Sequence, residues 1–253
     1  MTAIDELISP LSARSVALSL LLGSHPPRMS ARDLTTLGEH FGIAPATTRV
    51  ALSRMASAGD LVLADGTYAL APRHLERRSV TEELMRPRCR PHSGMWRMAV
   101  VVDRGRSAAR RAALRTDMMR HRFAELREGV WLRPDNLASH DAPQPEEVRS
   151  FVTLPDDERR LARELWDLDN WAETAHLLLD TLRSDGEAML RLAAAAAAVR
   201  HLCTDPALPD ELAPEHWPAD ELRWTYDDYR AELAETLTRI TASTPATTTQ
   251  EKR

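Results

Sequence analysis

The sequence predicts an α+β protein in three parts: an N-terminal winged helix-turn-helix, a central ferredoxin-like domain and a C-terminal helical domain. Between residues 30 and 70 the chain has the pattern of a helix, a tight turn, a second helix and a short hairpin. Between residues 95 and 154, the pattern predicts the order strand, helix, strand, strand, a further element and a last strand. From residue 156 onward, apolar residues recur at helical spacing.

The N-terminal part, residues 1–72, is predicted to begin with a helix over residues 12–22 that ends at Gly23. The next helix should begin at Ser30, because a serine hydroxyl can accept hydrogen bonds from the free backbone N–H groups of a helix start. The buried stripe of this helix has the spacing i, i+3 and i+7 and consists of Leu34, Leu37 and Phe41.

A short, stiff turn is predicted to join this helix to the next. Gly42 suits a left-handed helix end, and Pro45 suits a first helical position, where its missing N–H would have been unpaired anyway. At about 100° per residue, one face of the second helix becomes the core face. That face consists of Thr48, Ala51, Leu52, Met55 and Ala58.

The opposite face of the second helix carries small, hydroxyl and guanidinium groups, which suit the major groove of DNA. Arginine can bind guanine edges or phosphates, hydroxyls can donate to phosphates, and valine can contact a thymine methyl group. The predicted DNA-binding residues are Thr47, Arg49, Val50, Ser53 and Arg54. The alternative is a three-helix packing unit whose polar face is merely solvated, but the order of caps, turn and hairpin favours DNA binding.

Two further segments follow the second helix. Residues 61–70 alternate around Asp65-Gly66, a dipeptide favoured in two-residue hairpins because both central residues need positive φ. This hairpin would be the wing. Residues 73–94 are basic and punctuated by proline, and predict a linker helix over about residues 73–85.

The central part, residues 95–155, is predicted to form a ferredoxin-like domain. Residues 95–103 are an apolar run typical of a strand, and Ser107 should cap a helix that reaches about His121. Two short strands are expected around Glu128-Gly129, and another over residues 148–154.

The last part, residues 156–240, is predicted to be a helical domain that dimerises. Its long amphipathic stripes are typical of a core or a subunit interface. The alanine run over residues 193–198 would permit close helix packing. Residues 241–253 are rich in Thr, Ser and Pro and predict a disordered tail.

Composition narrows the classes of function. The sequence has no apolar stretch long enough to span a membrane and no signal-peptide pattern at its N-terminus, so we expect a cytoplasmic protein with no membrane partner. The net charge is −5, but residues 72–133 carry +9 and residues 134–253 carry −13. The basic segment is therefore the expected source of non-specific attraction to phosphates.

Cysteine and histidine usage does not indicate a disulfide framework or a metal site. The two cysteines lie far apart in the sequence, as Cys89 beside His92 and Cys203 beside His201. Neither pair belongs to a four-ligand zinc pattern. We expect no metal, no cofactor and no catalytic residues, because no hydrolase, metalloprotease or phosphate-loop pattern occurs.

Four blocks, in this order, resemble the PaaX family of bacterial transcriptional regulators. They are TTRVALSRMASAGDL with the hairpin, WRMAVVVDRGRSAARRAALRTDMMRHRFAELREGVWLRP, ELWDLDNW and DPALPDELAPEHWPA. The resemblance spans residues 12–240 and implies a homodimer that binds a double-stranded DNA operator and represses a catabolic gene cluster. It also implies release from DNA by an acyl- or aryl-coenzyme A effector.

The sequence departs from that family in three places. The wing carries Asp65 where relatives often have arginines, Ala44 replaces a capping Ser, and residues 172–178 are less aromatic. The first departure affects the contact of the wing with DNA, and the second weakens the start of the second helix. The third indicates that the ligand differs from that of the relatives.

An acyl-coenzyme A site needs arginines beside an apolar or aromatic pocket. Because the central part has both, the residues expected to bind the effector are Arg110, Arg111, Trp96 and Trp131. The alternatives are that the arginines of this helix solvate it, pair with the acidic C-terminal part or extend the DNA contact.

Two other functions stay open at this stage. The run VVVD followed by an arginine-rich helix and EGVWLRP also resembles the small CRISPR adaptation nuclease, in which Asp103 would be a metal ligand. Asp at a strand end is equally suited to a turn. The other alternative is an architectural DNA binder without an effector, or an activator.

Overall fold

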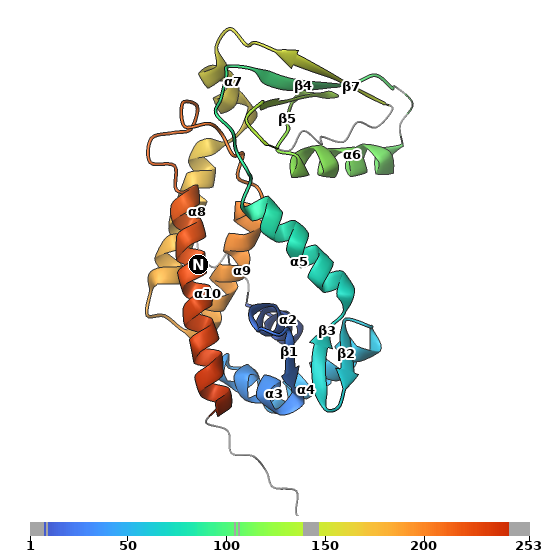
Figure 1. Cartoon of the computed structure of the whole chain (residues 1–253), viewed down its shortest axis with the longest axis vertical. Coiled ribbons are helices and arrows are strands. Elements are labelled where there is room, and N and C mark those ends of the chain that lie inside the picture. Colours follow the sequence, from blue (N-terminus) through green and yellow to red (C-terminus); the bar gives the residue numbers. More distant parts are fainter. Residues whose placement is uncertain (1–7, 9, 104, 106, 139–146, 243–253) are drawn as a thin grey trace, which may run out of the picture. The chain divides into compact units, whose positions relative to one another are not determined.

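The computed structural model contains α-helices and two antiparallel sheets, so the chain is an α+β protein. It describes residues 8, 10–103, 105, 107–138 and 147–242. The elements of these residues run in sequence from α2 to α10 and from β1 to β7 (Figure 1). They group into two compact units: Met1–Val80 with Leu178–Ala198 and Trp224–Arg253, and Thr81–Leu177 with Val199–Arg223.

Three helices open the first unit: α2 (Ala13–Gly23), α3 (Ala31–His40) and α4 (Pro45–Ser57). Serine side chains cap the first two, as predicted for α3. Ser12 Oγ accepts the N–H of Ser15 at 3.2 Å, and Ser30 Oγ accepts the N–H of Asp33 at 3.0 Å. Leu34, Leu37 and Phe41 are buried, which confirms the predicted stripe.

The turn between α3 and α4 is tight. Gly42 has a φ of 73°, and Ile43 donates its N–H to the carbonyl of Gly38 at 2.8 Å. Gly38 also allows close helix packing, because a Cβ at this position would lie 2.5 Å from Thr48 Oγ1. Ala44 provides no side-chain hydrogen bond to the start of α4, and Pro45 occupies its first turn.

A three-stranded sheet follows, with strands in the order β1-β3-β2. β2 (Leu61–Ala64) and β3 (Thr67–Leu70) form the predicted hairpin. Its turn residues Asp65 and Gly66 have φ values of 50° and 70°, as a two-residue turn of this kind requires. β1 (Arg28–Ser30), which the sequence did not predict, pairs with β3.

The carboxylate of Asp60 holds the first unit together at the end of α4. It accepts hydrogen bonds from Arg73 at 2.5 Å and from Arg14 at 3.0 Å, and it is hydrogen-bonded to His74 at 3.0 Å. Arg73 and His74 lie on α5 (Pro72–Met85), and Arg14 lies on α2. The hydrogen bond from Arg73, supported by those from His74 and Arg14, outweighs burial and holds the Asp60 pKa far below its usual range.

The second unit contains a four-stranded antiparallel sheet in the order β5-β6-β4-β7. Its strands are β4 (Trp96–Val101), β5 (Ala124–Arg127), β6 (Val130–Pro134) and β7 (Val148–Thr153). α6 (Ala108–Arg120) connects β4 to β5, and Ser107 Oγ accepts the N–H of Arg110 at 3.2 Å, as predicted. Figure 1 shows α6 lying along one side of this sheet.

The two faces of this sheet have separate cores. On the α6 face, Trp131 packs with Ala99, Leu114, Met118, Phe123 and Val148. On the other face, Trp96 packs with Leu132, Leu212 and Ala162 of α7 (Glu158–Leu165). Trp131 is opposite Ala99, three residues from Trp96, and side chains alternate between faces along a strand. The two tryptophans therefore lie on opposite faces of the sheet. This corrects the expectation that both belong to one effector site.

Three long helices complete the chain: α8 (Leu168–Arg183), α9 (Ala188–Leu202) and α10 (Ala219–Ala242). Most of the alanine run on α9 is buried. Each helix is divided between the two units, so the C-terminal helices do not group as one separate body. Of the predicted tail, residues 241 and 242 end α10, and the remainder lies outside the described residues.

Candidate nucleic-acid interface

The outer face of α4 is exposed along its whole length. All five predicted DNA-binding side chains are exposed, while Thr48, Leu52 and Met55 are buried on the opposite side. Ala51 is half-buried. Ala58 differs from the prediction, because it lies beyond the last turn as the C-cap residue and is exposed. The exposed face of α4 consists of Ala46, Thr47, Arg49, Val50, Ser53, Arg54 and Ser57.

The arginines on this face keep their charge available to a partner molecule. Neither Arg49 nor Arg54 takes part in any ion pair found within the described part of the chain. Val50 is 50% exposed between them, so its methyl groups are accessible to a partner molecule. The face therefore combines two guanidinium groups, three hydroxyl groups and the apolar side chain of Val50.

The hairpin beside α4 is apolar and acidic, not basic. Val62 and Leu63 of β2 are exposed, and the turn carries Asp65. Residues 61–70 contain no Lys or Arg. Any contact made by this hairpin would consequently add little attraction to phosphate.

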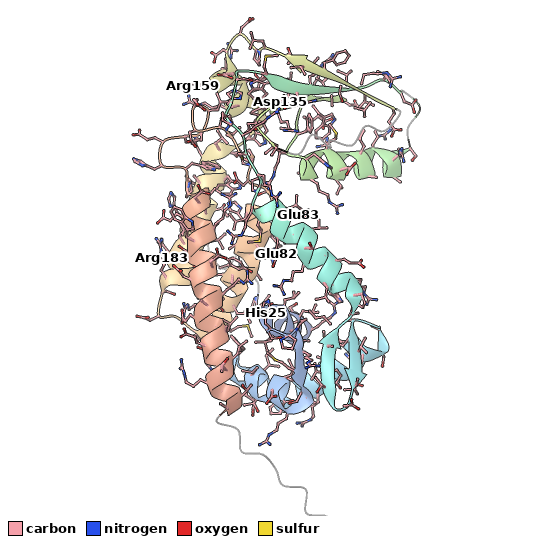
Figure 2. All side chains as sticks on the ribbon, viewed as in Figure 1. His25, Glu82, Glu83, Asp135, Arg159 and Arg183 are labelled. Carbon is pink, nitrogen blue, oxygen red and sulfur yellow. The ribbon has the colours of Figure 1, made fainter. Side chains whose placement is uncertain are left out.

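The basic segment contributes less free charge than its composition indicates. Acidic partners neutralise five of its arginines: Arg73, Arg90, Arg97, Arg110 and Arg115. Asp135, labelled in Figure 2, pairs with both Arg90 and Arg97. These ion pairs weaken the expectation that residues 72–133 attract DNA phosphates in general, because five of the arginines already pair with carboxylates of the protein.

Two more arginines of the segment are buried. Arg122 donates to the carbonyls of Leu84, Cys203 and Asp205. Arg133 stacks its guanidinium 5.1 Å from the Phe123 ring centroid, and desolvation lowers its pKa to about 10. Both arginines therefore make their contacts inside the second unit.

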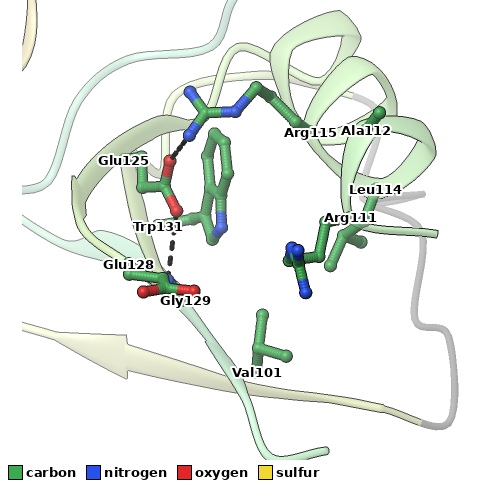
Figure 3. Close-up of a pocket in the computed structure, with 9 residues that line it drawn as sticks. All are labelled: Val101, Arg111, Ala112, Leu114, Arg115, Glu125, Glu128, Gly129 and Trp131. Atoms are coloured by element: carbon green, nitrogen blue, oxygen red, sulfur yellow. Dashed lines mark hydrogen bonds and ion pairs between the residues drawn. The ribbon is translucent and has the colours of Figure 1, made fainter. Parts of the chain in front are cut away.

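A pocket lies between α6 and the β5–β6 hairpin (Figure 3). Its volume is about 530 Å³. Trp131 and Leu114 provide its apolar lining, and Arg111 points into it from α6. Arg115 pairs with Glu125 and lies over Trp131, with its guanidinium 5.4 Å from the ring centroid. Glu125 also accepts the N–H of Gly129 at 3.1 Å.

The structure brings together only two of the four residues expected to bind an effector. Arg111 and Trp131 line the pocket. Arg110 instead pairs with Glu147, at 2.7 and 3.1 Å, and that carboxylate raises the arginine pKa. Trp96 is fully buried on the other face of the sheet. Sequence reasoning missed Arg115, although it lies on the same helix as Arg111, and it missed Glu125 and Glu128 because their place beside that helix depends on the folded β5–β6 hairpin.

Asp103 does not belong to a cluster of potential metal ligands. Its Oδ1 accepts the N–H of Gly105 at 3.0 Å, the turn role that suits Asp after a strand. Among the described residues, no group of three or more His, Cys, Asp or Glu side chains could hold a metal ion. Nothing in this geometry supports the nuclease alternative.

The histidines and cysteines considered for metal binding have other contacts. His92 Nε2 is 2.9 Å from Glu158 Oε2, and His201 Nε2 is 2.9 Å from the carbonyl of Trp171. Burial raises the pKa of both Cys89 and Cys203, so neither thiol is activated as a thiolate. Within the described chain, no helix is long and apolar enough to cross a membrane.

Comparisons with known proteins place the chain in a family of transcriptional regulators. It belongs to the PaaX-like family, whose members bind DNA and generally regulate phenylacetate catabolism. The model described as "PaaX-like protein" matches residues 12–73, and the model described as "PaaX-like protein C-terminal domain" matches residues 166–243.

A solved structure extends the similarity over nearly the whole chain. The uncharacterized protein Rv0674 from Mycobacterium tuberculosis is 44% identical, with a TM-score of 0.83. The match covers 91% of this chain and 99% of that one. No curated protein matches the chain.

Proposed function

We propose that the protein is a DNA-binding transcriptional regulator in which α3, the turn and α4 form a helix-turn-helix and the β2–β3 hairpin forms its wing. The observation that carries this proposal is the exposed outer face of α4, whose two arginines have no acidic partner in the described part of the chain. The burial of the opposite face on α2 and α3 holds this helix rigidly.

Each residue on this face has a specific proposed role. Arg49 and Arg54 bind guanine edges or phosphates, Val50 contacts a thymine methyl group, and Thr47 and Ser53 donate to phosphates. Because Ala44 does not cap α4, the first N–H groups of the helix are also left for a phosphate. This contact would compensate for the missing capping residue.

The proposed regulator is a cytoplasmic homodimer that represses a catabolic gene cluster. Its second unit would be ferredoxin-like, which the strand order β5-β6-β4-β7 and the helix between β4 and β5 support. A two-fold dimer should recognise two half-sites about one helical turn apart, or a multiple of that spacing.

Selection from a random DNA pool tests the proposal without knowledge of the operator. The purified protein should enrich one sequence with two-fold symmetry. Its affinity should fall steeply with salt, because phosphate contacts release counterions. Failure to enrich any sequence, with only salt-sensitive non-specific binding, would contradict the proposed recognition role.

We also propose that the pocket beside α6 binds the acyl portion of an acyl- or aryl-coenzyme A effector. Arg111 supplies a cationic group, and Trp131 with Leu114 supplies an apolar surface. Arg110 and Trp96 are not part of this proposal, since the first pairs with Glu147 and the second lies on the other face of the sheet.

Thermal-shift screening with acyl-coenzyme A thioesters tests the effector site. A ligand at about 100 times its dissociation constant stabilises a protein by about 2.7 kcal/mol. The shift should shrink in Arg111→Ala and persist in Arg120→Ala, a matched control from the last turn of the same helix. Free coenzyme A should give a smaller shift, and equal shifts for all ligands would argue against acyl recognition.

A further inference from the structure

Two arginines lie directly opposite one another in the four-stranded sheet. Arg97 of β4 pairs with Arg133 of β6 in antiparallel register, and directly opposite residues point to the same face. That face is the one covered by α6, because Trp131, two residues before Arg133, belongs to the core beneath this helix. Like charges in directly opposite positions destabilise a sheet, so the pair needs a compensating anion.

The carboxylate beside this pair is already shared. Asp135 Oδ1 accepts a hydrogen bond from Arg97 Nε at 3.0 Å and lies 2.7 Å from Arg90 Nη2. Arg133 forms no ion pair with a carboxylate in the described part of the chain. Burial and repulsion from Arg97 and Arg90 lower the Arg133 pKa to about 10, although Asp135 acts in the opposite direction. Arg133 therefore stays charged at neutral pH, and one carboxylate faces three guanidinium groups.

Arg133 is deeply buried, and one of its donors has no acceptor. The residue is 2% exposed, and its Nε is a buried nitrogen without a hydrogen-bond partner among the residues that the structure describes. Its guanidinium lies 5.1 Å from the Phe123 ring centroid, and Nη1 donates to the carbonyl of Pro134 at 3.2 Å. A buried charge with an unsatisfied donor is costly to the fold, which indicates that a group outside the polypeptide completes the site.

Arg97 provides the accessible side of the pair. Its side chain is 22% exposed and donates to Asp135 from Nε. Its two terminal nitrogens have no hydrogen-bond partner within the described residues. The pair therefore offers free donors from two guanidinium groups on one face of the sheet, and one of these groups is open to solvent.

We propose that Arg97 and Arg133 form a binding site for the phosphate or carboxylate group of a small molecule. Either group presents oxygens that accept hydrogen bonds from two guanidinium groups, and its negative charge would offset the positive excess beside Asp135. Arg133 is too deeply buried for the backbone phosphate of a DNA duplex to reach it, so the ligand is a small anion. The site is separate from the pocket lined by Arg111 and does not rest on the proposed DNA recognition.

Side-chain NMR with inorganic phosphate, acetate and chloride tests the site directly. The Nε–H resonances of Arg97 and Arg133 would be assigned from their loss in Arg97→Lys and Arg133→Lys. Phosphate, acetate or both should shift the Arg133 resonance until it saturates, whereas sodium chloride at equal ionic strength should not. Saturation by only one of the two anions identifies which group the natural ligand carries. Equal responses to all three salts would overturn the proposal.

Thermal unfolding separates anion binding from a purely structural role of Arg133. In sodium chloride, Arg133→Met should unfold at a temperature at least as high as the parent, because the variant lacks a buried charge that has no anion. The anion that saturates the NMR signal should raise the unfolding temperature of the parent and of Arg120→Met, but not that of Arg133→Met. Arg120 is the matched control because it is an exposed arginine in the last turn of α6.

Arg97→Met tests the accessible side and serves if Arg133→Met does not fold. The Arg133 resonance should then need about tenfold more anion to saturate, which is the loss expected for one charge-assisted contact. A lower unfolding temperature of Arg133→Met in chloride, with equal stabilisation of all variants by the anion, would show a structural role and overturn the proposal. The proposed DNA recognition would stand in that case, because neither arginine lies on α4.

Discussion

Helices α4 and α6 have the same length and both carry arginines, but the arginines of the two helices have different partners. Each has 13 residues and exposed arginines. On α6, Arg110 pairs with Glu147 and Arg115 with Glu125. On α4, Arg49 and Arg54 have no acidic partner in the described part of the protein.

This difference teaches that the number of arginines does not identify a nucleic-acid surface. The carboxylates that pair with Arg110 and Arg115 of α6 come from β5 and from the residue before β7, so only the folded sheet brings them to the helix. In the part of the chain that the structure describes, no carboxylate pairs with the arginines of the α4 face. Residues 72–133, which carry the highest positive charge, are consequently less suited to bind phosphate than residues 1–71, whose net charge is close to zero.

The largest expected effect concerns the support of α4. Replacing Asp60 with Asn removes the carboxylate that Arg14, Arg73 and His74 share. We expect a loss of about 3 kcal/mol in the stability of the first unit, because a nearly buried charge network loses its common acceptor. Hydrogen exchange of the α2 and α4 amides would measure this loss. Asp65→Asn at the exposed hairpin turn is the control.

The same carboxylate predicts a pH dependence. Because its pKa is depressed in the folded state, its stabilisation is present above the ordinary value of 3.8 and is lost as the pH falls through the folded pKa. Acid unfolding of the parent should therefore destabilise the first unit more than it does in Asp60→Asn. Parallel pH profiles for both proteins would contradict this assignment.

A smaller effect is expected where α3 approaches α4. Gly38→Ala would place a methyl group 2.5 Å from Thr48 Oγ1, so overpacking should cost about 2 kcal/mol. Gly23→Ala is the matched control, since no atom lies within 4 Å of its added Cβ. Adding Thr48→Ala should restore part of the loss, as thermal unfolding would show. No recovery in the double variant would mean that the strain lies elsewhere.

The smallest effect is expected on α6. Arg110→Ala removes an exposed ion pair with Glu147, and such pairs contribute little in water. Its thermal stability and its affinity for the selected DNA should equal those of the parent within error. A clear loss of DNA affinity would show that Arg110 leaves Glu147 for phosphate, and the contrast between the two helices would then fail.

The sequence predicts local elements of the N-terminal region well because their signals are local. Ser30, Gly42, Pro45 and the Asp65-Gly66 turn each act within a few residues, and each has its expected conformation. β1 was not predicted because its three residues form a strand only by pairing with β3.

The candidate effector site was less predictable because it depends on register. The expected strands formed, but Trp96 and Trp131 belong to opposite faces, and no sequence signal gives that parity before the pairing is known. Likewise, Glu147 is 37 residues from Arg110, so its ion pair is not a local property. Arg111 was predictable from its helix alone, whereas Glu125 and Glu147 meet the arginines of that helix only in the folded sheet.

A titration with DNA shows whether the outer face of α4 contacts the operator. Affinity for the selected operator would be measured at fixed salt for the parent, Arg49→Ala and Arg120→Ala. Arg49→Ala should weaken binding by about 1–3 kcal/mol, and Arg120→Ala should match the parent. Equal affinities for all three proteins would instead mean that Arg49 of α4 lies outside the DNA interface.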